Sequence, residues 1–165
     1  MKNITILVAS VEKNMALAEI LQTQLTSLNI DSQIIDLVAL DLVMYHSIEE
    51  SKGIPSSVSK LIETLNSSQG YIVVAPEYNY SIPPILTNAI AWISRVGDDF
   101  KACFTAVPIL LATHSGGGGT DVLRDMRNQF SKLGAEVYAQ EILTTYKKPL
   151  ETTFSMQVLE EFTQS

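Results

Sequence analysis

The residues best suited to binding or catalysis lie in one short segment, residues 76–84, which reads Pro-Glu-Tyr-Asn-Tyr-Ser-Ile-Pro-Pro. Tyr78 and Tyr80 offer ring faces and edges, and the amide of Asn79 both donates and accepts hydrogen bonds. The three prolines fix φ and order the turn before any ligand arrives. A flat heteroaromatic ligand with polar edges fits these groups. A rigid surface turn whose tyrosines merely cover the edge of a sheet fits them equally well.

Two other segments carry polar or glycine-rich sequence, residues 10–15 (Ser-Val-Glu-Lys-Asn-Met) and residues 114–120 (His-Ser-Gly-Gly-Gly-Gly-Thr). Neither contains the G-x-G-x-x-G of dinucleotide-binding folds, and the tetraglycine lacks the Lys-Ser/Thr pair of a P-loop. No G-x-S-x-G elbow precedes a helix, which argues against a hydrolase of that type. Cys103, His46 and His114 do not have the spacing of a metal site, so no metal is expected.

Alternating elements must position these three segments. Met15, Ala18, Leu21, Leu25 and Leu28 recur at spacings of three and four, which is typical of an amphipathic helix, and similar helical patterns separate the later apolar runs. Residues 38–53 show no clear period. Five apolar, β-branched runs predict strands at residues 4–9, 32–37, 71–75, 106–113 and 135–139.

Apolar strands joined by helices predict a parallel sheet covered on both faces, and right-handed crossovers favour a doubly wound three-layer α/β fold. In such sheets, ligands bind beyond the carboxyl ends of the strands. That edge is where residues 10–15, 76–84 and 114–120 are expected to meet. No repeat or linker interrupts residues 1–165, which we interpret as a single domain.

The composition argues against some classes of binding partner. The net charge is −7, so nucleic acid and anionic membrane surfaces are poor candidates, whereas a small anionic ligand can still be held locally by backbone N–H groups. The single cysteine forms no internal disulfide, and no apolar run is long enough to span a membrane. We interpret the apolar N-terminal run as a strand rather than a leader and expect a cytoplasmic protein.

The middle segment and its flanks resemble a known family, the NAD(P)H-dependent FMN reductases, which includes quinone, chromate and azo-dye reductases built on the flavodoxin-like fold. The resemblance covers roughly residues 4–137 and also includes Ile35-Asp36-Leu37 and the Thr113–Gly119 glycine segment. It is most specific at Pro76-Glu77-Tyr78-Asn79, Ser81-Ile82-Pro83, Leu86, Asn88-Ala89-Ile90 and Trp92-Ile93-Ser94-Arg95.

The resemblance implies a flavodoxin-like FMN-binding domain with a five-stranded parallel sheet in the order 2-1-3-4-5. It implies FMN as cofactor, NAD(P)H as co-substrate, and hydride transfer through FMN to a flavin, quinone or similar small-molecule acceptor. It also implies a homodimer or homotetramer. No catalytic acid–base residue is expected, because the cofactor carries the chemistry. The implied cofactor-binding residues are Ser10, Lys13, Asn14, Met15, Pro76, Glu77, Tyr78, Asn79, Ser81, His114, Ser115, Gly116, Gly117 and Gly118.

Two alternatives stay open: the acidic surface also suits a flavodoxin-like single-electron carrier, and the altered first loop suits a degenerate binding module that has lost FMN. The family's Gly-Ser-x-Arg phosphate loop is replaced by Ala9-Ser10-Val11-Glu12, and Lys13 is the available substitute for the missing arginine. Because Glu12 repels a phosphate dianion, we expect its side chain to point to solvent and FMN to bind more weakly than is usual. Tyr80 stands where the family often has glycine.

Individual residues outside the phosphate loop have structural interpretations as well. Asp36 is expected to close a turn, Trp92 to pack or to contact a second subunit, and Cys103 to be a small buried hydrophobe. For Glu77 we expect the backbone to matter more than the carboxylate. His114 is interpreted either as a ligand contact or as a hydrogen-bonded loop anchor.

Overall fold

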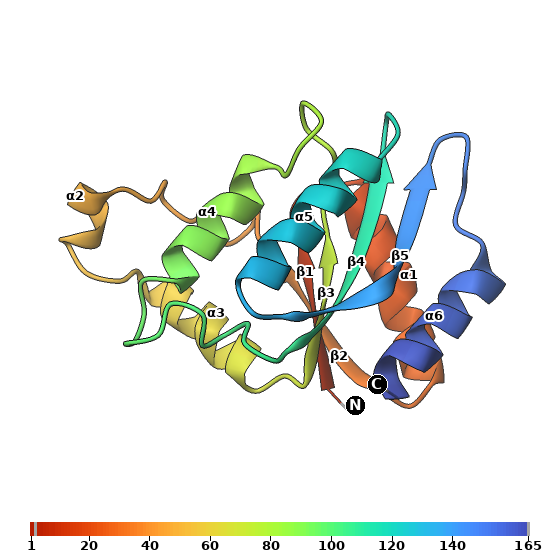
Figure 1. The fold of residues 1–165 in the computed structure, drawn as a ribbon, viewed down its shortest axis with the longest axis horizontal. Helices are drawn as coiled ribbons and strands as arrows, with labels where there is room; N and C mark the ends of the chain where they lie inside the picture. The colour runs from red at the N-terminus through yellow and green to blue at the C-terminus, as the bar shows by residue number, and fades with distance from the viewer. Residues whose placement is uncertain (2, 165) are drawn as a thin grey trace.

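The protein is a three-layer α/β structure in a computed structural model that describes residue 1 and residues 3–164 (Figure 1). Five parallel strands form one sheet in the order β2-β1-β3-β4-β5, which confirms the predicted topology. Their bounds are β1 Asn3–Val8, β2 Asp31–Asp36, β3 Gly70–Val74, β4 Pro108–Ser115 and β5 Glu136–Thr145.

Helices cover both faces of the sheet because successive side chains of each central strand point to opposite faces. Ile4, Ile6 and Val8 of β1 pack with α1 (Lys13–Ser27) and α6 (Thr152–Gln164). Leu7 and Ala9 belong to the opposite core, which contains the inner faces of α3 (Ser56–Asn66), α4 (Pro84–Ile93) and α5 (Thr120–Lys132). Helix α6 follows the last strand and completes the cover on the α1 side of the sheet.

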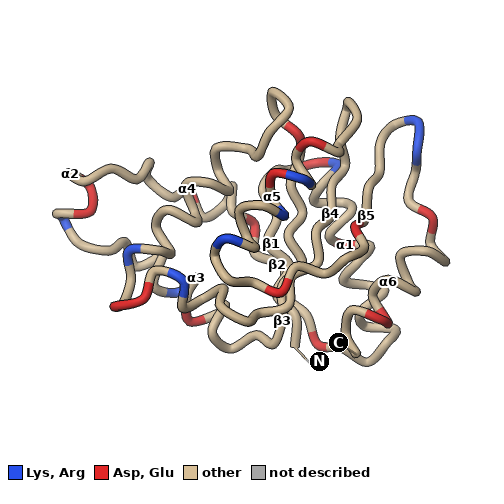
Figure 2. Tube along the Cα trace, viewed as in Figure 1, with Lys and Arg blue, Asp and Glu red and all other residues tan. Residues whose placement is uncertain are grey.

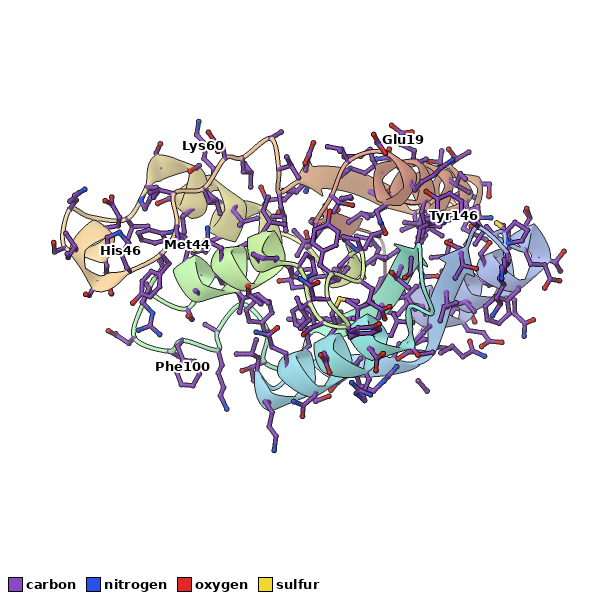
Figure 3. The ribbon with its side chains drawn as sticks, turned by 90° about the horizontal axis from the view of Figure 1, so that it is seen from above. Glu19, Met44, His46, Lys60, Phe100 and Tyr146 are labelled. Carbon is purple, nitrogen blue, oxygen red and sulfur yellow. The ribbon has the colours of Figure 1, made fainter. Side chains whose placement is uncertain are left out.

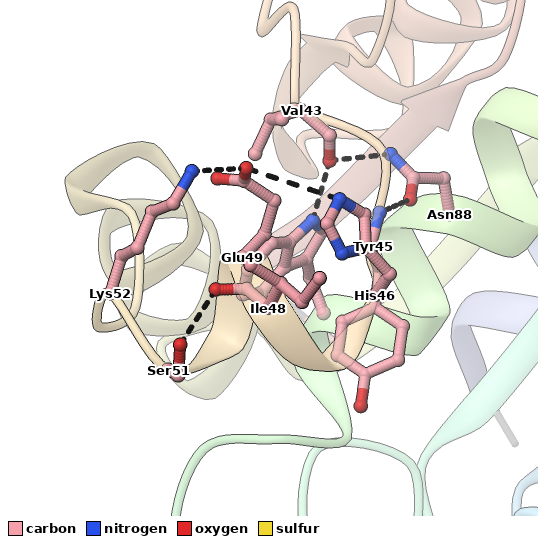
Figure 4. Close-up of polar contacts among 9 residues, drawn as sticks. Val43, Tyr45, His46, Ile48, Glu49, Ser51, Lys52 and Asn88 are labelled. Carbon is pink, nitrogen blue, oxygen red and sulfur yellow. Dashed lines mark hydrogen bonds and ion pairs between the residues drawn. The ribbon is translucent and has the colours of Figure 1, made fainter.

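The unperiodic residues 38–53 form an arm that carries the one-turn helix α2 (Ser47–Glu50) at the far left of Figure 1. Figure 4 shows how α4 holds this arm: the Asn88 Oδ1 accepts the Tyr45 N–H at 2.8 Å, and its Nδ2 donates to the Val43 carbonyl at 3.2 Å. The buried Trp92 donates its indole N–H to the same carbonyl at 2.7 Å. Trp92 is thus a packing residue, as expected.

Strand β5 is longer than the sequence pattern predicted. It runs to Thr145 rather than ending at residue 139, with a register shift opposite Ile109 and Leu111. Arg127 of α5 stabilises the irregular segment by donating to the Tyr138 carbonyl at 2.9 Å and to the Glu141 carboxylate at 2.6 Å. The extension matters because it carries the end of β5 to the same edge as the end of β4.

The carboxyl ends of the strands and the three singled-out segments lie at the upper edge of Figure 1, opposite the two termini. Acidic and basic residues are scattered along the chain, and Lys147 and Lys148 form the basic tip of the loop between β5 and α6 (Figure 2). Among the described residues, no helix is long and apolar enough to cross a membrane. Nor do the described histidines, cysteines and acids form a group that could hold a metal ion.

Candidate functional site

A hollow of about 220 Å³ opens between the loop after β1 and the ends of β4 and β5. Figure 3 looks down on this edge and shows Tyr146 there, with Met44 and His46 of the arm at the far end of the molecule. The lining combines turns that expose backbone with the side chains of one lysine, one glutamate, one histidine and two tyrosines. It consists of Ser10, Val11, Glu12, Lys13, Asn14, Pro76, Tyr78, His114, Gly116 and Tyr146.

The loop after β1 leaves backbone donors at the start of α1 without a side-chain cap. Glu12 precedes α1 with φ of 57° and makes no side-chain cap, so the N–H groups of Asn14 and Met15 at the helix start have no capping acceptor there. Those N–H groups and the helix dipole attract negative charge. Lys13 is exposed beside them, and Glu12 is exposed as expected from the sequence, although it also lines the hollow.

Asn14 itself has a structural task. Its amide is buried and pairs with both backbone groups of His114, accepting the N–H at 2.8 Å and donating to the carbonyl at 3.0 Å. It thereby joins the start of α1 to the end of β4. Asn14 and Met15 can therefore contribute to ligand binding mainly through their backbone N–H groups, since the Met15 side chain packs against the core under α1.

His114 offers one unused ring nitrogen. Thr144 donates its hydroxyl hydrogen to the Thr113 carbonyl, so at 3.0 Å the Thr144 oxygen must accept from His114 Nδ1, which assigns the proton to Nδ1. The Nε2 atom is buried with no hydrogen-bond partner among the described residues. Burial, and secondarily the charge of Lys13, lower the pKa of His114. His114 therefore lines the hollow as a neutral imidazole whose Nε2 is an unpaired, buried acceptor, and its ring lies perpendicular to that of Tyr146 at 5.0 Å between centroids.

Residues 78–81 form a tight turn in which the N–H groups of Tyr78 and Ser81 bond to each other's carbonyls, at 3.1 and 3.0 Å. Its central residues, Asn79 and Tyr80, both have positive φ, 49° and 62°. Such a turn favours asparagine and glycine, so Tyr80 is strained, and the residue is 77% exposed. The turn presents both tyrosines at the rim rather than burying them.

Glu77 corrects one expectation from the sequence. Its carboxylate, not only its backbone, is engaged: Oε2 accepts from the N–H groups of Asp121 and Val122 at 3.1 and 3.3 Å. Ser81 adds a second bond to the same helix, donating to the Asp125 carboxylate at 2.8 Å. Glu77 and Ser81 therefore fix the turn to α5 and are not free to bind a ligand with those atoms.

The glycine loop is exposed at Gly116, Gly117 and Gly118, where absence of a Cβ lets a ligand approach the backbone. Ser115 is buried and supports the loop by accepting the Gly117 N–H at 3.0 Å. Gly119 is required sterically: its φ is 77°, and a Cβ there would lie 3.1 Å from side-chain atoms of Thr113 and Ser115.

Two neighbouring hollows share walls with the first. One of about 280 Å³ lies between Gly116, Gly117 and the end of β5, and includes Tyr146 and Lys147. The other, of about 350 Å³ and mainly apolar, lies between the loop after β1, Val38 and the prolines that start α4. The polar end of the site is thus continuous with an apolar end along one edge of the sheet.

A family model described as NADPH-dependent FMN reductase matches residues 2–147 of this sequence. The chain belongs to the NADPH-dependent FMN reductase family. A quinone reductase of Escherichia coli K12 is 38% identical over 78 residues, which are 47% of this chain and 40% of that enzyme. An NAD(P)H-dependent FMN reductase of Pseudomonas aeruginosa is 35% identical over 52 residues, 32% of this chain and 28% of that protein. The matches therefore span less than half of these curated relatives.

Solved structures of flavoenzymes share the fold of this family member. The NAD(P)H:(acceptor) oxidoreductase FerB from Paracoccus denitrificans has a TM-score of 0.83 at 19% identity, covering 99% of this chain and 96% of that one. An FMN-dependent NADH-azoreductase from Bacillus anthracis, solved with FMN, has a TM-score of 0.68 at 16% identity, covering 99% and 97%. At these identities the likeness establishes the flavodoxin-like fold.

The residues present are compatible with FMN, the cofactor for which the family is named. An uncapped helix start with an adjacent lysine suits a phosphate, the orphaned Nε2 of His114 suits a hydroxyl or N–H donor, and the open glycines suit a flat ring. The first hollow brings together Ser10, Lys13, Asn14, Pro76, Tyr78, His114 and Gly116, and Gly117 lines the adjoining one.

The other cofactor-binding residues that the resemblance implies lie close by but do not line either of these two hollows. They are Met15, Glu77, Asn79, Ser81, Ser115 and Gly118. Sequence reasoning missed Tyr146, because β5 was expected to end at residue 139 and not at Thr145, the residue before Tyr146. Asp36 closes a turn as expected, accepting the Val38 and Ala39 N–H groups at 2.8 and 3.1 Å, and Cys103 is buried.

Proposed function

We propose that this protein is an FMN-dependent NAD(P)H oxidoreductase that passes electrons to a flavin, a quinone or a similar small acceptor. The observation that carries the proposal is the meeting of an anion-binding helix start, a rigid tyrosine-bearing turn and an open glycine loop at one edge of the sheet. Family membership supports this class of chemistry, and the convergence of the three loops supports this edge of the sheet as the place where it occurs.

The phosphate of FMN is assigned to the first loop, where Ser10, Lys13 and the N–H groups at the start of α1 supply the donors. The ring is assigned to the space between residues 76–79 and the glycine loop. FMN held there would supply the redox chemistry, which is acceptance of a hydride from NAD(P)H and transfer of electrons to the acceptor. The protein's part is to bind and orient: His114 presents a neutral acceptor, and the turn and the glycine loop supply rigid backbone.

We further propose that residues 1–165 act as a single FMN-binding domain, that the protein works as a homodimer or homotetramer, and that it is cytoplasmic. The exposed tyrosines at the rim support assembly, because a second copy or an acceptor could cover them. Size-exclusion chromatography with light scattering, carried out with and without FMN, tests the assembly.

The decisive experiment is anaerobic titration of the purified protein. The apoprotein is saturated with FMN, unbound flavin is removed, and NADH or NADPH is added while flavin absorbance is followed. Prompt bleaching, followed by recovery on adding a quinone, is the expected result. FMN binding without bleaching by either nucleotide indicates a one-electron carrier instead. Failure to retain FMN at micromolar concentration indicates a binding module without the cofactor, and both of those outcomes contradict the proposal.

A further inference from the structure

Helix α5 has no N-terminal cap of its own. Its capping position is Gly119, which has no side chain to accept hydrogen bonds, and no local side chain replaces it. The groups that a cap normally satisfies are the N–H groups of the second and third helical residues. In this structure those residues are Asp121 and Val122, and both bond to Glu77, which lies 44 and 45 positions earlier in the chain.

Glu77 therefore caps the helix from another loop, and this joins two sides of the proposed ring site. Glu77 belongs to the turn after β3, and α5 follows directly from the glycine loop. The second carboxylate oxygen, Oε1, lies 3.4 Å from the place where a Cβ on Gly117 would stand. With the Ser81–Asp125 bond at 2.8 Å, the turn is held to α5 at both of its ends.

We propose that Glu77 is a positioning residue that sets the separation of the turn from the glycine loop and whose charge offsets the positive end of α5. This inference rests on the proposed function for its link to FMN. The first effect is geometric, since the carboxylate is the bond between the two walls. The second is electrostatic: a helix N-terminus without a neighbouring carboxylate favours other negative charge, so neutralising Glu77 favours the anionic, reduced flavin over the oxidised one.

Two substitutions separate these effects. Glu77→Gln retains an oxygen that can accept both N–H groups, because one oxygen accepts both in the native chain, and it removes the charge. Glu77→Ala removes the acceptor and the charge together. Glu63→Gln is the matched control, because Glu63 is an exposed acid on α3 whose substitution changes the net charge equally.

The first readout uses the apoprotein and needs no flavin. Amide hydrogen exchange of Asp121 and Val122 is expected to accelerate about tenfold or more in Glu77→Ala, because two charge-assisted bonds are lost. It should stay near the native rate in Glu77→Gln and in Glu63→Gln. Unchanged exchange in Glu77→Ala, or equal acceleration in Glu77→Gln, overturns the positioning role whatever the protein does with FMN.

The second readout is the affinity for FMN in its oxidised and reduced forms. Glu77→Ala should weaken the binding of oxidised FMN about tenfold. Glu77→Gln should change the affinity for oxidised FMN by less than about threefold. It should raise the affinity for reduced FMN severalfold, which is measured as a less negative reduction potential of the bound flavin. An unchanged potential in Glu77→Gln overturns the electrostatic part. If native protein binds no FMN, the proposed function fails, while the exchange experiment still decides whether Glu77 joins the two loops.

Discussion

The side chain of Asn14 should contribute more to the free energy of unfolding than is usual for a residue between a loop and a helix. His114 lies on β4 beyond the end of β3, and it faces the same way as Ala112, whose carbonyl accepts the Ala75 N–H. The backbone of His114 has no strand partner on that side. The Asn14 amide replaces the missing strand with bonds of 2.8 and 3.0 Å, at a site where Asn14 is 4% exposed.

Asn14→Ala should therefore lower the free energy of unfolding by about 2–4 kcal/mol, because two buried hydrogen bonds are lost and two backbone groups are left unpaired. A domain of ordinary stability has about 5–15 kcal/mol in total, so the loss is a large fraction. Urea titration of the apoprotein, followed by far-UV circular dichroism and by the fluorescence of the single tryptophan, should show the midpoint falling by about 1 M or more.

Two further variants test the reasoning behind that number. Asn14→Asp keeps an acceptor for the His114 N–H but turns a carboxylate toward its carbonyl, so it should be destabilising although it is isosteric. Asn128→Ala is the matched control, because Asn128 is exposed on α5, and it should change stability by less than about 0.5 kcal/mol. A loss of less than about 0.5 kcal/mol in Asn14→Ala would refute the view that Asn14 completes the sheet.

Three other predictions follow from strained or charged residues at the same edge. Tyr80→Gly should stabilise the protein by about 0.5–1 kcal/mol in urea titration, because Tyr80 has φ of 62° and is mostly exposed; a loss of stability would show that its ring makes a compensating contact. Glu12→Arg should tighten FMN about tenfold in fluorescence titration, since a repulsive charge beside the phosphate becomes attractive, and an unchanged dissociation constant would argue against a phosphate in this loop. Because the folded pKa of His114 lies below its ordinary value of 6.5, stability should be full above pH 6.5 and fall as the pH drops toward the folded pKa, and His114→Gln should lack that part of the urea-midpoint profile.

The fold could be predicted from the sequence because it depends on periodic patterns. Central strands such as β1 and β3 are continuous apolar runs, and parallel connections leave few topologies. The end of β5 could not be predicted in this way, because Gln140 and Glu141 interrupt the apolar pattern in a strand at the edge of the sheet. Arg127 of α5 binds Glu141 and the Tyr138 carbonyl and so stabilises this part of the strand. The sequence of β5 alone does not predict that contact.

The convergence of the three loops at one edge could be predicted, but the contacts among them could not. Topology places the three loops at one edge, and the residue types suggest what they bind. The bonds of Asn14 to His114 and of Glu77 to α5 join residues 100 and about 44 positions apart. A sequence read along the chain shows that these side chains are polar, but it does not show whether a ligand or a distant backbone group satisfies them.

Strain supports the same assignment of the site independently of any resemblance. Among the described residues, six that are not glycine have positive φ, and Glu12, Asn79 and Tyr80 belong to the loop after β1 and the turn after β3. Such conformations cost free energy and persist only where surrounding bonds enforce them. Here the enforcing bonds are those between Tyr78 and Ser81, Glu77 and α5, and Asn14 and His114. Because these bonds restrain backbone that packing alone would leave relaxed, the edge is preorganised before a ligand binds, which is the property that a site for a flat, rigid cofactor requires.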